Sequence, residues 1–346
     1  MEHDDAPPAN PIYTGDAITR ALGTVVGDAL WERLRAPQLY VPTPSLVDAV
    51  NVALTVRQPL LVSGEPGCGK THLAHSIVAE LAFRYPKWFS SELLVFNAKS
   101  TSVANELFYN FDAIGRFYAT KEGVNQSVAP EHYIDLAALG LAIVRAAPLD
   151  TTPDALRARA RAGSQQRSVV LIDEIDKAPR DFPNDILNEI EAMAFEIREL
   201  GGLKVSADFA WAPVVVITTN SDKNLPNAFL RRCVYYDIPF PKEQLNQIVT
   251  RRVKGIVARQ DVLLAEALTL FLELRHERHR LDKKPGVAEL LAWLEVIAQS
   301  ALSGRASIVA DPNLIRRNLS LLLKSSDDMA IGRQIVEDWL RTRGTS

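Results

Sequence analysis

The sequence predicts an α/β protein in which helices cover a parallel sheet and an all-helical domain follows. Two observations predict this fold class. Five short runs of aliphatic, β-branched or aromatic residues are each separated from the next by sequence long enough for a helix, which is the alternation expected of a parallel sheet covered by helices. After residue 241 the strand-like runs stop, and apolar residues recur instead at the spacing of amphipathic helices.

The expected elements follow one another along the chain. We expect a flexible lead over residues 1–16, then helices over 17–34 and 44–56. The five expected strands are "PLLVS" (59–63), "LLVFN" (93–97), "SVVLID" (168–173), "PVVVIT" (213–218) and "CVYYDI" (233–238).

Two domains are expected from this order of elements. The sheet and its helices make up the first domain, over 17–241, with inserts at about 104–135 and 150–167. The helical domain covers 242–346. Within it Leu290, Leu294 and Ile297 fall on one helix face, which predicts a buried stripe.

Composition limits the class of protein. The 346 residues are 47% hydrophobic and 23% charged, as in a globular protein with a buried core. A formal net charge of -3 gives no overall attraction to nucleic acid or to acidic membranes. Only Cys68 and Cys233 are cysteines, which favours a reducing compartment over a disulfide framework. The acidic start lacks a secretory signal and no run is long enough to span a bilayer, so we expect a cytoplasmic protein.

A glycine-rich segment follows the first strand. "GEPGCGKT" matches G-x-x-x-x-G-K-S/T at Gly64, Gly69, Lys70 and Thr71, with a strand before it and a helix after it. Backbone N–H groups of such a loop surround phosphate oxygens, the lysine reaches the β- and γ-phosphates, and the hydroxyl binds Mg²⁺. The alternative is a glycine turn that matches by chance. The residues expected to bind nucleotide are Gly64, Glu65, Pro66, Gly67, Cys68, Gly69, Lys70, Thr71 and His72.

Acidic residues end the third strand, in "VVLIDEID". Asp173 is expected at the tip of the strand, where its carboxylate can complete the Mg²⁺ shell together with Thr71. Glu174 is placed to polarise the attacking water. Asp-Glu after a buried strand is also common at surface turns. The motif therefore indicates a nucleotide site only in combination with the loop at 64–71.

Polar residues also follow the fourth strand. Asn220 ends "VVVITTN", where it can hold the attacking water or, alternatively, cap the next turn. Arg231 and Arg232 end a short helical stretch. Two adjacent arginines are usually solvated, but a guanidinium is also what a γ-phosphate needs from a neighbouring subunit.

Taken in order, these motifs resemble the MoxR-type AAA+ ATPases over roughly residues 38–300. The most specific part is "PNAFLRRCVYYDIPFP" (226–241). The resemblance implies a P-loop AAA+ core with a helical lid, ATP and Mg²⁺ as cofactors, Asn220 as sensor 1, and Arg232 as the finger that reaches the adjacent subunit's nucleotide. It also implies a ring-shaped homo-oligomer, often a hexamer. At the position that aligns with the family's sensor 2 arginine, this chain has Ala288. The alternatives are that another cation supplies the charge, namely Lys283, Lys284, Arg316 or Arg317, or that the lid contacts nucleotide weakly.

The inserts and two other patterns allow more than one interpretation. The aromatic residues of 104–123 could face the central pore, as the family's insert does, or belong to the core, which we favour; they are Phe108, Phe111, Phe117 and Tyr118. We also expect a hairpin at 196–205. The Ala/Arg-rich stretch at 154–167 is interpreted as a flexible, solvated insert rather than a nucleic-acid contact, and "HERH" (276–279) as a solvated helix end rather than a metal site.

The sequence therefore predicts an ATP hydrolase that remodels or activates a protein partner. Family members often act with proteins that carry a von Willebrand factor A domain. The alternatives are a nucleic-acid-directed motor or loader, and a nucleotide-gated scaffold. No membrane partner is expected, and the pI near 6.1 counts against nucleic acid.

Overall fold

The computed structural model describes residues 7–8, 10–22, 32, 36–121, 129–161, 163–221, 225–253, 261–301 and 307–343. The described residues form two compact units. The first contains those within 1–21, 42–64 and 70–238, and the second those within 22–41, 65–69 and 239–346.

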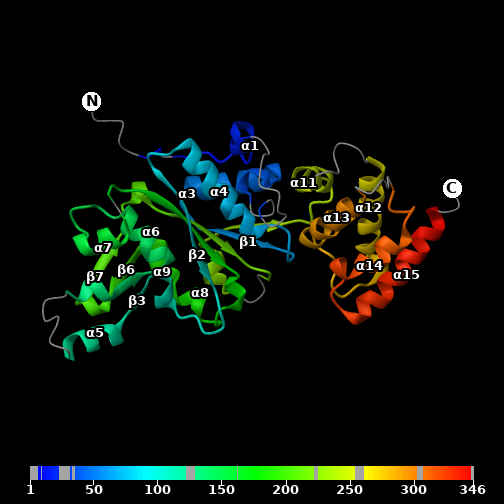
Figure 1. Cartoon of the computed structure of the whole chain (residues 1–346). Coiled ribbons are helices and arrows are strands. Elements are labelled where there is room, and N and C mark those ends of the chain that lie inside the picture. Colours follow the sequence, from blue (N-terminus) through cyan, green and yellow to red (C-terminus); the bar gives the residue numbers. More distant parts are fainter. Residues whose placement is uncertain are drawn as a thin grey trace. The chain divides into compact units, whose positions relative to one another are not determined.

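A five-stranded parallel sheet forms the centre of the first unit (Figure 1). Its order is β2-β5-β8-β1-β9. The strands are β1 (Leu60–Gly64), β2 (Phe89–Asn97), β5 (Arg167–Asp173), β8 (Val214–Thr218) and β9 (Val234–Ile238). All five predicted strands are confirmed; only β2 begins well before its predicted start, because its pairing with β5 extends past an irregularity to Phe89.

Helices cover both faces of this sheet. In Figure 1, α3 (Pro44–Val56) and α4 (Lys70–Arg84) lie over one face, and α6 (Ala138–Ala146) and α9 (Leu187–Ala192) over the other. Shorter helices of this unit are α1 (Ala17–Leu22), α5 (Ala113–Lys121), α7 (Asp154–Arg159), α8 (Phe182–Asp185) and α10 (Asn227–Leu230). Because both faces are covered, the interior residues of β5 are fully buried, which explains why the strand is a continuous apolar run.

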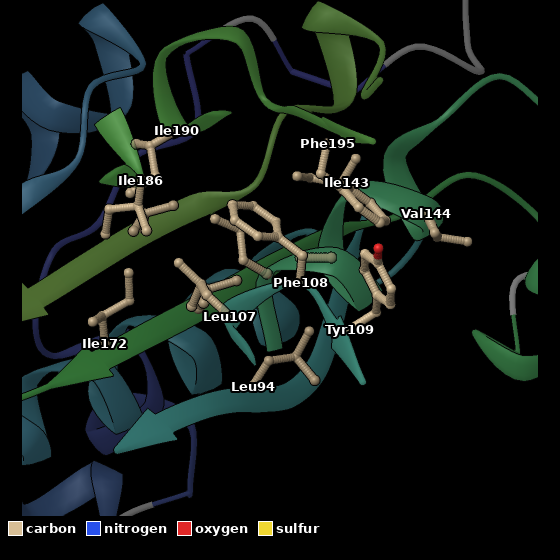
Figure 2. Close-up of a cluster of buried hydrophobic side chains, with 14 of the residues drawn as sticks. Leu94, Leu107, Phe108, Tyr109, Ile143, Val144, Ile172, Ile186, Ile190 and Phe195 are labelled. Carbon is tan, nitrogen blue, oxygen red and sulfur yellow. The ribbon is translucent and has the colours of Figure 1, made fainter. Parts of the chain in front are cut away.

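Figure 2 shows the core between the sheet and α6 and α9. Leu94 and Ile172 contribute from the sheet, and the rings of Phe108 and Phe195 stack with centroids 5.5 Å apart. At Gly140 in α6, a Cβ atom would lie 1.9 Å from the Phe108 carbonyl oxygen. The close approach of α6 to this segment therefore requires glycine at position 140.

Two small antiparallel pairs extend the first unit. β6 (Ala194–Ile197) pairs with β7 (Leu203–Ser206), which confirms the predicted hairpin. β3 (Tyr109–Phe111) pairs with β4 (Ile134–Leu136) within the 104–135 insert, of which 122–128 lie outside the described residues. The core prediction for the insert holds for Phe108, which is buried, but is wrong for Phe117 and Tyr118, which are exposed on α5.

The predicted flexible lead is wrong for residues 12–16, which we call the N-terminal strap. Tyr13 is fully buried and its hydroxyl lies 2.9 Å from the Ser76 hydroxyl of α4. The buried carboxylate of Glu80, also in α4, accepts hydrogen bonds from the backbone N–H groups of Thr14 and Gly15. These long-range polar contacts order the strap. Residues 1–6 and 9 of the expected lead lie outside the described residues.

The prediction of a solvated insert at 154–167 is wrong for its last residue, Arg167. Arg167 opens β5 with 2% of its surface exposed, and its guanidinium lies 4.9 Å from the Phe89 ring centroid. Burial lowers the pKa of Arg167 to about 10. The residue is therefore part of the packed interior rather than of a solvated basic run.

Beyond residue 239, the regular elements that the structure describes in the second unit are all helices. This unit contains α11 (Leu245–Arg252), α12 (Asp261–Leu274), α13 (Val287–Ala301), α14 (Pro312–Leu322) and α15 (Ser326–Arg343). Leu290, Leu294 and Ile297 are buried in its core, as their shared helix face predicts. Across the part of the chain that the structure describes, no helix combines the length and apolarity needed to cross a membrane.

Candidate active site

The glycine-rich loop joins the end of β1 to the start of α4. Gly64, Gly67 and Gly69 have φ angles of 146°, 79° and 98°. Residues with a Cβ atom rarely adopt such values, so this loop shape depends on glycine. The Cys68 N–H donates to the Glu65 carbonyl oxygen over 3.2 Å, which closes a turn within the loop.

Lys70 opens α4, and 8% of it is exposed. Its ammonium donates to the Gly64 carbonyl oxygen over 2.7 Å and to Oδ1 of Asn220 over 3.0 Å. The sheet order explains the second contact, because β1 and β8 are neighbours and α4 begins just after β1. Two residues predicted from separate motifs therefore meet at one edge of the sheet.

Thr71 and Asp173 also lie together. The Thr71 hydroxyl donates to the carboxylate of Asp173, with distances of 3.2 and 3.1 Å to Oδ1 and Oδ2. Asp173 is the last residue of β5 and is half-buried. A hydroxyl and a carboxylate side by side form an all-oxygen donor set, which suits Mg²⁺.

Glu174 follows directly and has an unusual backbone. Its φ and ψ angles are 56° and 50°, in the left-handed region. Its carboxylate pairs with the Lys177 ammonium at 2.5 Å. That hydrogen bond raises the pKa of Lys177.

The observed groups fit Mg²⁺ and a nucleoside triphosphate. The oxygens of Thr71 and Asp173 would hold the metal, and the loop with Lys70 would hold the phosphates. The metal, when bound, would neutralise charge that develops on the phosphates during transfer.

The other residues predicted to bind nucleotide are divided between the two units. His72 is half-buried in the first turn of α4, and Cys68 is half-buried in the loop. Within the second unit, Glu65 accepts a hydrogen bond from Arg275 at 2.8 Å. Pro66 approaches Gly286 so closely that a Cβ atom there would lie 2.9 Å from the Pro66 carbonyl oxygen.

Arg232 is not part of the Lys70 cluster. It follows α10, and its Nε donates to the Glu191 carboxylate at 2.7 Å while Nη1 donates to the Ala228 carbonyl oxygen. Its side chain is 43% exposed. Arg232 and Cys233 line a pocket of about 210 Å³ in the first unit.

No arginine replaces the missing sensor 2 residue at the aligned position. Ala288 lies beside the loop, where a Cβ atom at Gly67 would be 3.4 Å from the Ala288 Cβ. Two of the cations considered from the sequence are paired elsewhere, since Lys284 binds Glu277 and Arg316 binds Glu337.

The metal alternative for the histidines gains no support. Among the described residues, no group of three or more His, Cys, Asp or Glu could hold a metal ion. His279 instead pairs with Glu273.

A family model decides which proteins this chain belongs with. The model, described as "ATPase family associated with various cellular activities (AAA)", matches residues 60–241. The chain is an AAA-family protein. The matched range contains the whole Lys70–Asp173–Asn220 cluster together with Arg232, and membership implies ATPase activity in general.

Curated protein sequences and solved structures were also compared with this AAA protein. No curated protein matches its sequence. A solved structure of Cdc6p from Pyrobaculum aerophilum is 16% identical, covering 87% of this chain and 73% of that one, with a TM-score of 0.47. The RuvB Holliday junction branch migration motor of Thermotoga maritima is 14% identical, covering 86% and 75%, with a TM-score of 0.45.

Sequence reasoning missed several polar residues of this AAA site. Thr218 and Asp176 bridge the ends of β5 and β8, and Lys177 pairs with Glu174. A signal was present for Thr218, because a threonine ends an otherwise apolar strand run. Arg275 and Glu65 are 210 positions apart, and no local sequence pattern predicts their contact.

Proposed function

We propose that this AAA protein is a MoxR-like ATPase, which couples the binding and hydrolysis of Mg-ATP at subunit boundaries to the remodelling or activation of a protein partner. The observation that carries the proposal is the placement of Arg232. Its guanidinium is exposed and pairs with an exposed carboxylate, Glu191, rather than with the Lys70 cluster. It is therefore accessible to a neighbouring subunit, which is where an arginine finger acts.

Each residue of the cluster has a proposed role. The loop amides and Lys70 hold the phosphates, and Thr71 and Asp173 hold Mg²⁺. Glu174 takes the proton of the attacking water, and Asn220 orients the same water. Because Lys70 and Asn220 are already in contact, the phosphate-binding and water-orienting groups belong to one connected site.

The active form is proposed to be a homo-oligomeric ring, with six subunits as the expected number. Arg232 of each subunit reaches the γ-phosphate bound by its neighbour, so that hydrolysis depends on assembly. The sheet-bearing unit is the nucleotide-binding domain and the helices after residue 241 are its lid.

The partner class is proposed from the MoxR resemblance. It is a protein, with a von Willebrand factor A domain as the first candidate.

The proposed place of action is the cytoplasm. The two cysteines favour it, because neither is in a disulfide.

The rival functions are a nucleic-acid motor and a nucleotide-gated scaffold. Two of the four arginines in the basic run at 154–167 are engaged within the protein, since Arg167 is buried and Arg157 pairs with Asp154. A motor should bind DNA or RNA with an affinity that falls steeply with salt. A scaffold should assemble with ATP without needing turnover.

The test is analytical ultracentrifugation of the full chain with Mg-ATP, combined with ATPase assays over a range of protein concentrations. We expect a ring to form and specific activity to rise as it does. Salt-dependent nucleic-acid binding that stimulates hydrolysis would favour the motor instead. A monomer that hydrolyses ATP at the full rate would contradict the proposal.

A further inference from the structure

Thr218 lies where the ends of two neighbouring strands meet. It is the last residue of β8, 1% of it is exposed, and β8 is hydrogen-bonded to β5. Its hydroxyl contacts both residues that end the β5 motif. Oγ1 lies 2.5 Å from Oδ1 of Asp173 and 2.8 Å from the backbone nitrogen of Glu174.

The direction of these hydrogen bonds is fixed by chemistry. The Glu174 N–H can only donate, so it occupies a lone pair of the threonine oxygen. The hydroxyl hydrogen is then directed to the ionised carboxylate of Asp173, which can only accept. Hydrogen bonds to a charged acceptor are the shorter and stronger kind. One hydroxyl thus orients the carboxylate and holds the backbone of the next residue.

The backbone of Glu174 has a particular need for such support. Its φ of 56° is costly for a residue with a side chain. Such conformations persist only where surrounding contacts impose them, and they cluster at functional sites. The bond from its N–H to Thr218 is one of those contacts.

A second residue makes the reverse connection. Asp176, which follows β5, accepts hydrogen bonds from the backbone N–H of Asn220 at 3.1 Å and from the Thr219 hydroxyl at 3.2 Å. The Thr218 side chain therefore connects β8 to the residues at the end of β5. The Asp176 side chain connects the segment after β5 to the residues after β8. We call Thr218 and Asp176 the strand-end clasp.

We propose that the strand-end clasp positions the catalytic groups: Thr218 sets the carboxylate of Asp173 for Mg²⁺ and the backbone of Glu174, while Asp176 sets Asn220. This inference rests on the ATPase site described under Proposed function. Neither residue touches nucleotide in this scheme, so both act through others. Residues that orient metal ligands in this way typically change metal affinity or activity by about 10- to 100-fold when replaced.

The test titrates Mg²⁺ against binding of a fluorescent ATP analogue, and measures ATP turnover in parallel. Thr218→Val keeps the shape of the side chain but removes the hydroxyl. It should need about 10- to 100-fold more Mg²⁺ for tight nucleotide binding, while binding in EDTA is unchanged. Thr218→Ser restores the hydroxyl and should return the Mg²⁺ requirement to the parental value.

Asp176→Ala gives a contrasting result. It should lower turnover with the Mg²⁺ requirement unchanged, because Asp176 contacts Asn220 and not a proposed metal ligand. Thr152→Val is the matched control: Thr152 is also buried, but its hydroxyl donates to the Pro148 carbonyl oxygen away from the site. It should keep the parental Mg²⁺ requirement.

The outcomes separate the inference from the function it rests on. A parental protein that binds no ATP would overturn both. Mg²⁺-dependent turnover by the parent, together with a parental Mg²⁺ requirement in Thr218→Val, would overturn the inference alone. The same holds if Thr218→Ser behaves like Thr218→Val, because the hydroxyl that serine keeps would then not set the Mg²⁺ requirement. Circular dichroism checks that each variant is folded, and Thr218→Ala replaces the valine variant if that one is not.

Discussion

The ammonium of Lys70 donates a hydrogen bond to the side-chain oxygen of Asn220 over 3.0 Å, although the two residues are 150 positions apart. The Gly64 carbonyl oxygen accepts a second hydrogen bond from the same buried ammonium. Binding a nucleotide would exchange these contacts for phosphate oxygens. That exchange connects phosphate binding to the residue proposed to orient water.

Lys70→Ala should abolish ATP binding, because it removes the positive charge that offsets the β- and γ-phosphates. A titration with fluorescent ATP measures the affinity. Lys87→Ala, which replaces an exposed lysine, serves as the control and should bind normally. Near-parental affinity in the Lys70 variant would refute the assignment of the loop.

Glu174→Gln should bind ATP and keep it. Asp173 and Thr71 remain to hold the metal, but the amide cannot accept the proton of water, and a general base contributes about 10²- to 10⁴-fold to rate. Chromatography of the nucleotide that copurifies with the variant should show ATP rather than ADP. If the variant hydrolyses ATP at the parental rate, Glu174 is not the base.

Arg232→Ala should bind ATP almost normally yet lose most hydrolysis. Arginine fingers contribute about a thousandfold or more in rate. Arg231→Ala, next to it and also exposed, is the matched control and should stay active.

Mixing Arg232→Ala with Lys70→Ala tests whether the finger acts in trans. In a mixed ring, an intact nucleotide site from the first variant can face an intact arginine from the second, so part of the ATPase activity should return. If hetero-oligomers form without recovery, the trans mechanism is wrong.

The two cysteines should differ in reactivity with an alkylating reagent. Burial raises the pKa of Cys233 to about 12. Since the thiolate is the nucleophile, Cys233 should react negligibly at pH 8 and faster only as pH approaches that pKa. Cys68 in the phosphate loop should react first, and ATP should protect it; mass spectrometry locates the label. Equal labelling of both, or labelling of Cys68 that ignores ATP, would contradict this.

Asp328 should stabilise the helical unit at neutral pH. Burial alone would raise the pKa of its carboxyl, but hydrogen bonds with Ser325 and with the backbone N–H groups of Asp282 and Lys283 outweigh burial and lower it. The folded-state pKa then lies below the unfolded one. The stabilisation is therefore present above the unfolded pKa and is lost as pH falls through the folded pKa.

Asp328→Ala should consequently cost about 1–3 kcal/mol at pH 7, because two N–H groups lose their acceptor. Urea unfolding measures this difference. The difference between the parent and the variant should shrink as pH falls through the folded-state pKa of Asp328, because the parental carboxyl becomes protonated there. A difference that stays constant from pH 7 into that acidic range would show that the ionised carboxylate is not responsible.

The strands and the Lys70 and Asp173 motifs could be predicted because their signals are local. A parallel strand buried on both faces is a continuous apolar run, and parallel strands bring the residues after their carboxyl ends to one edge. Thr218 and Arg167 could not be assigned in this way. Thr218 ends one strand and Arg167 begins another, and the role of each depends on the neighbour across the sheet.

The favoured assignment of Phe117 and Tyr118 to the core is also wrong. Their helical spacing resembles that of a core stripe, but α5 belongs to the insert and turns these rings outward. Tertiary position, and not periodicity, decides the burial of such residues.

The N-terminal strap has a consequence for trimming this protein. A chain cut back to the family-matched range, 60–241, would keep every motif of the nucleotide site. It would also lose Tyr13, Thr14 and Gly15, and so leave Glu80 as a charged carboxylate in α4 without its three hydrogen-bond donors. Only the Arg84 guanidinium, 3.5 Å from Oε1 of Glu80, would then offset this charge on a formerly buried surface of the helix that begins at the phosphate-binding lysine. Loss of ATPase activity in such a fragment would therefore not by itself implicate the catalytic residues.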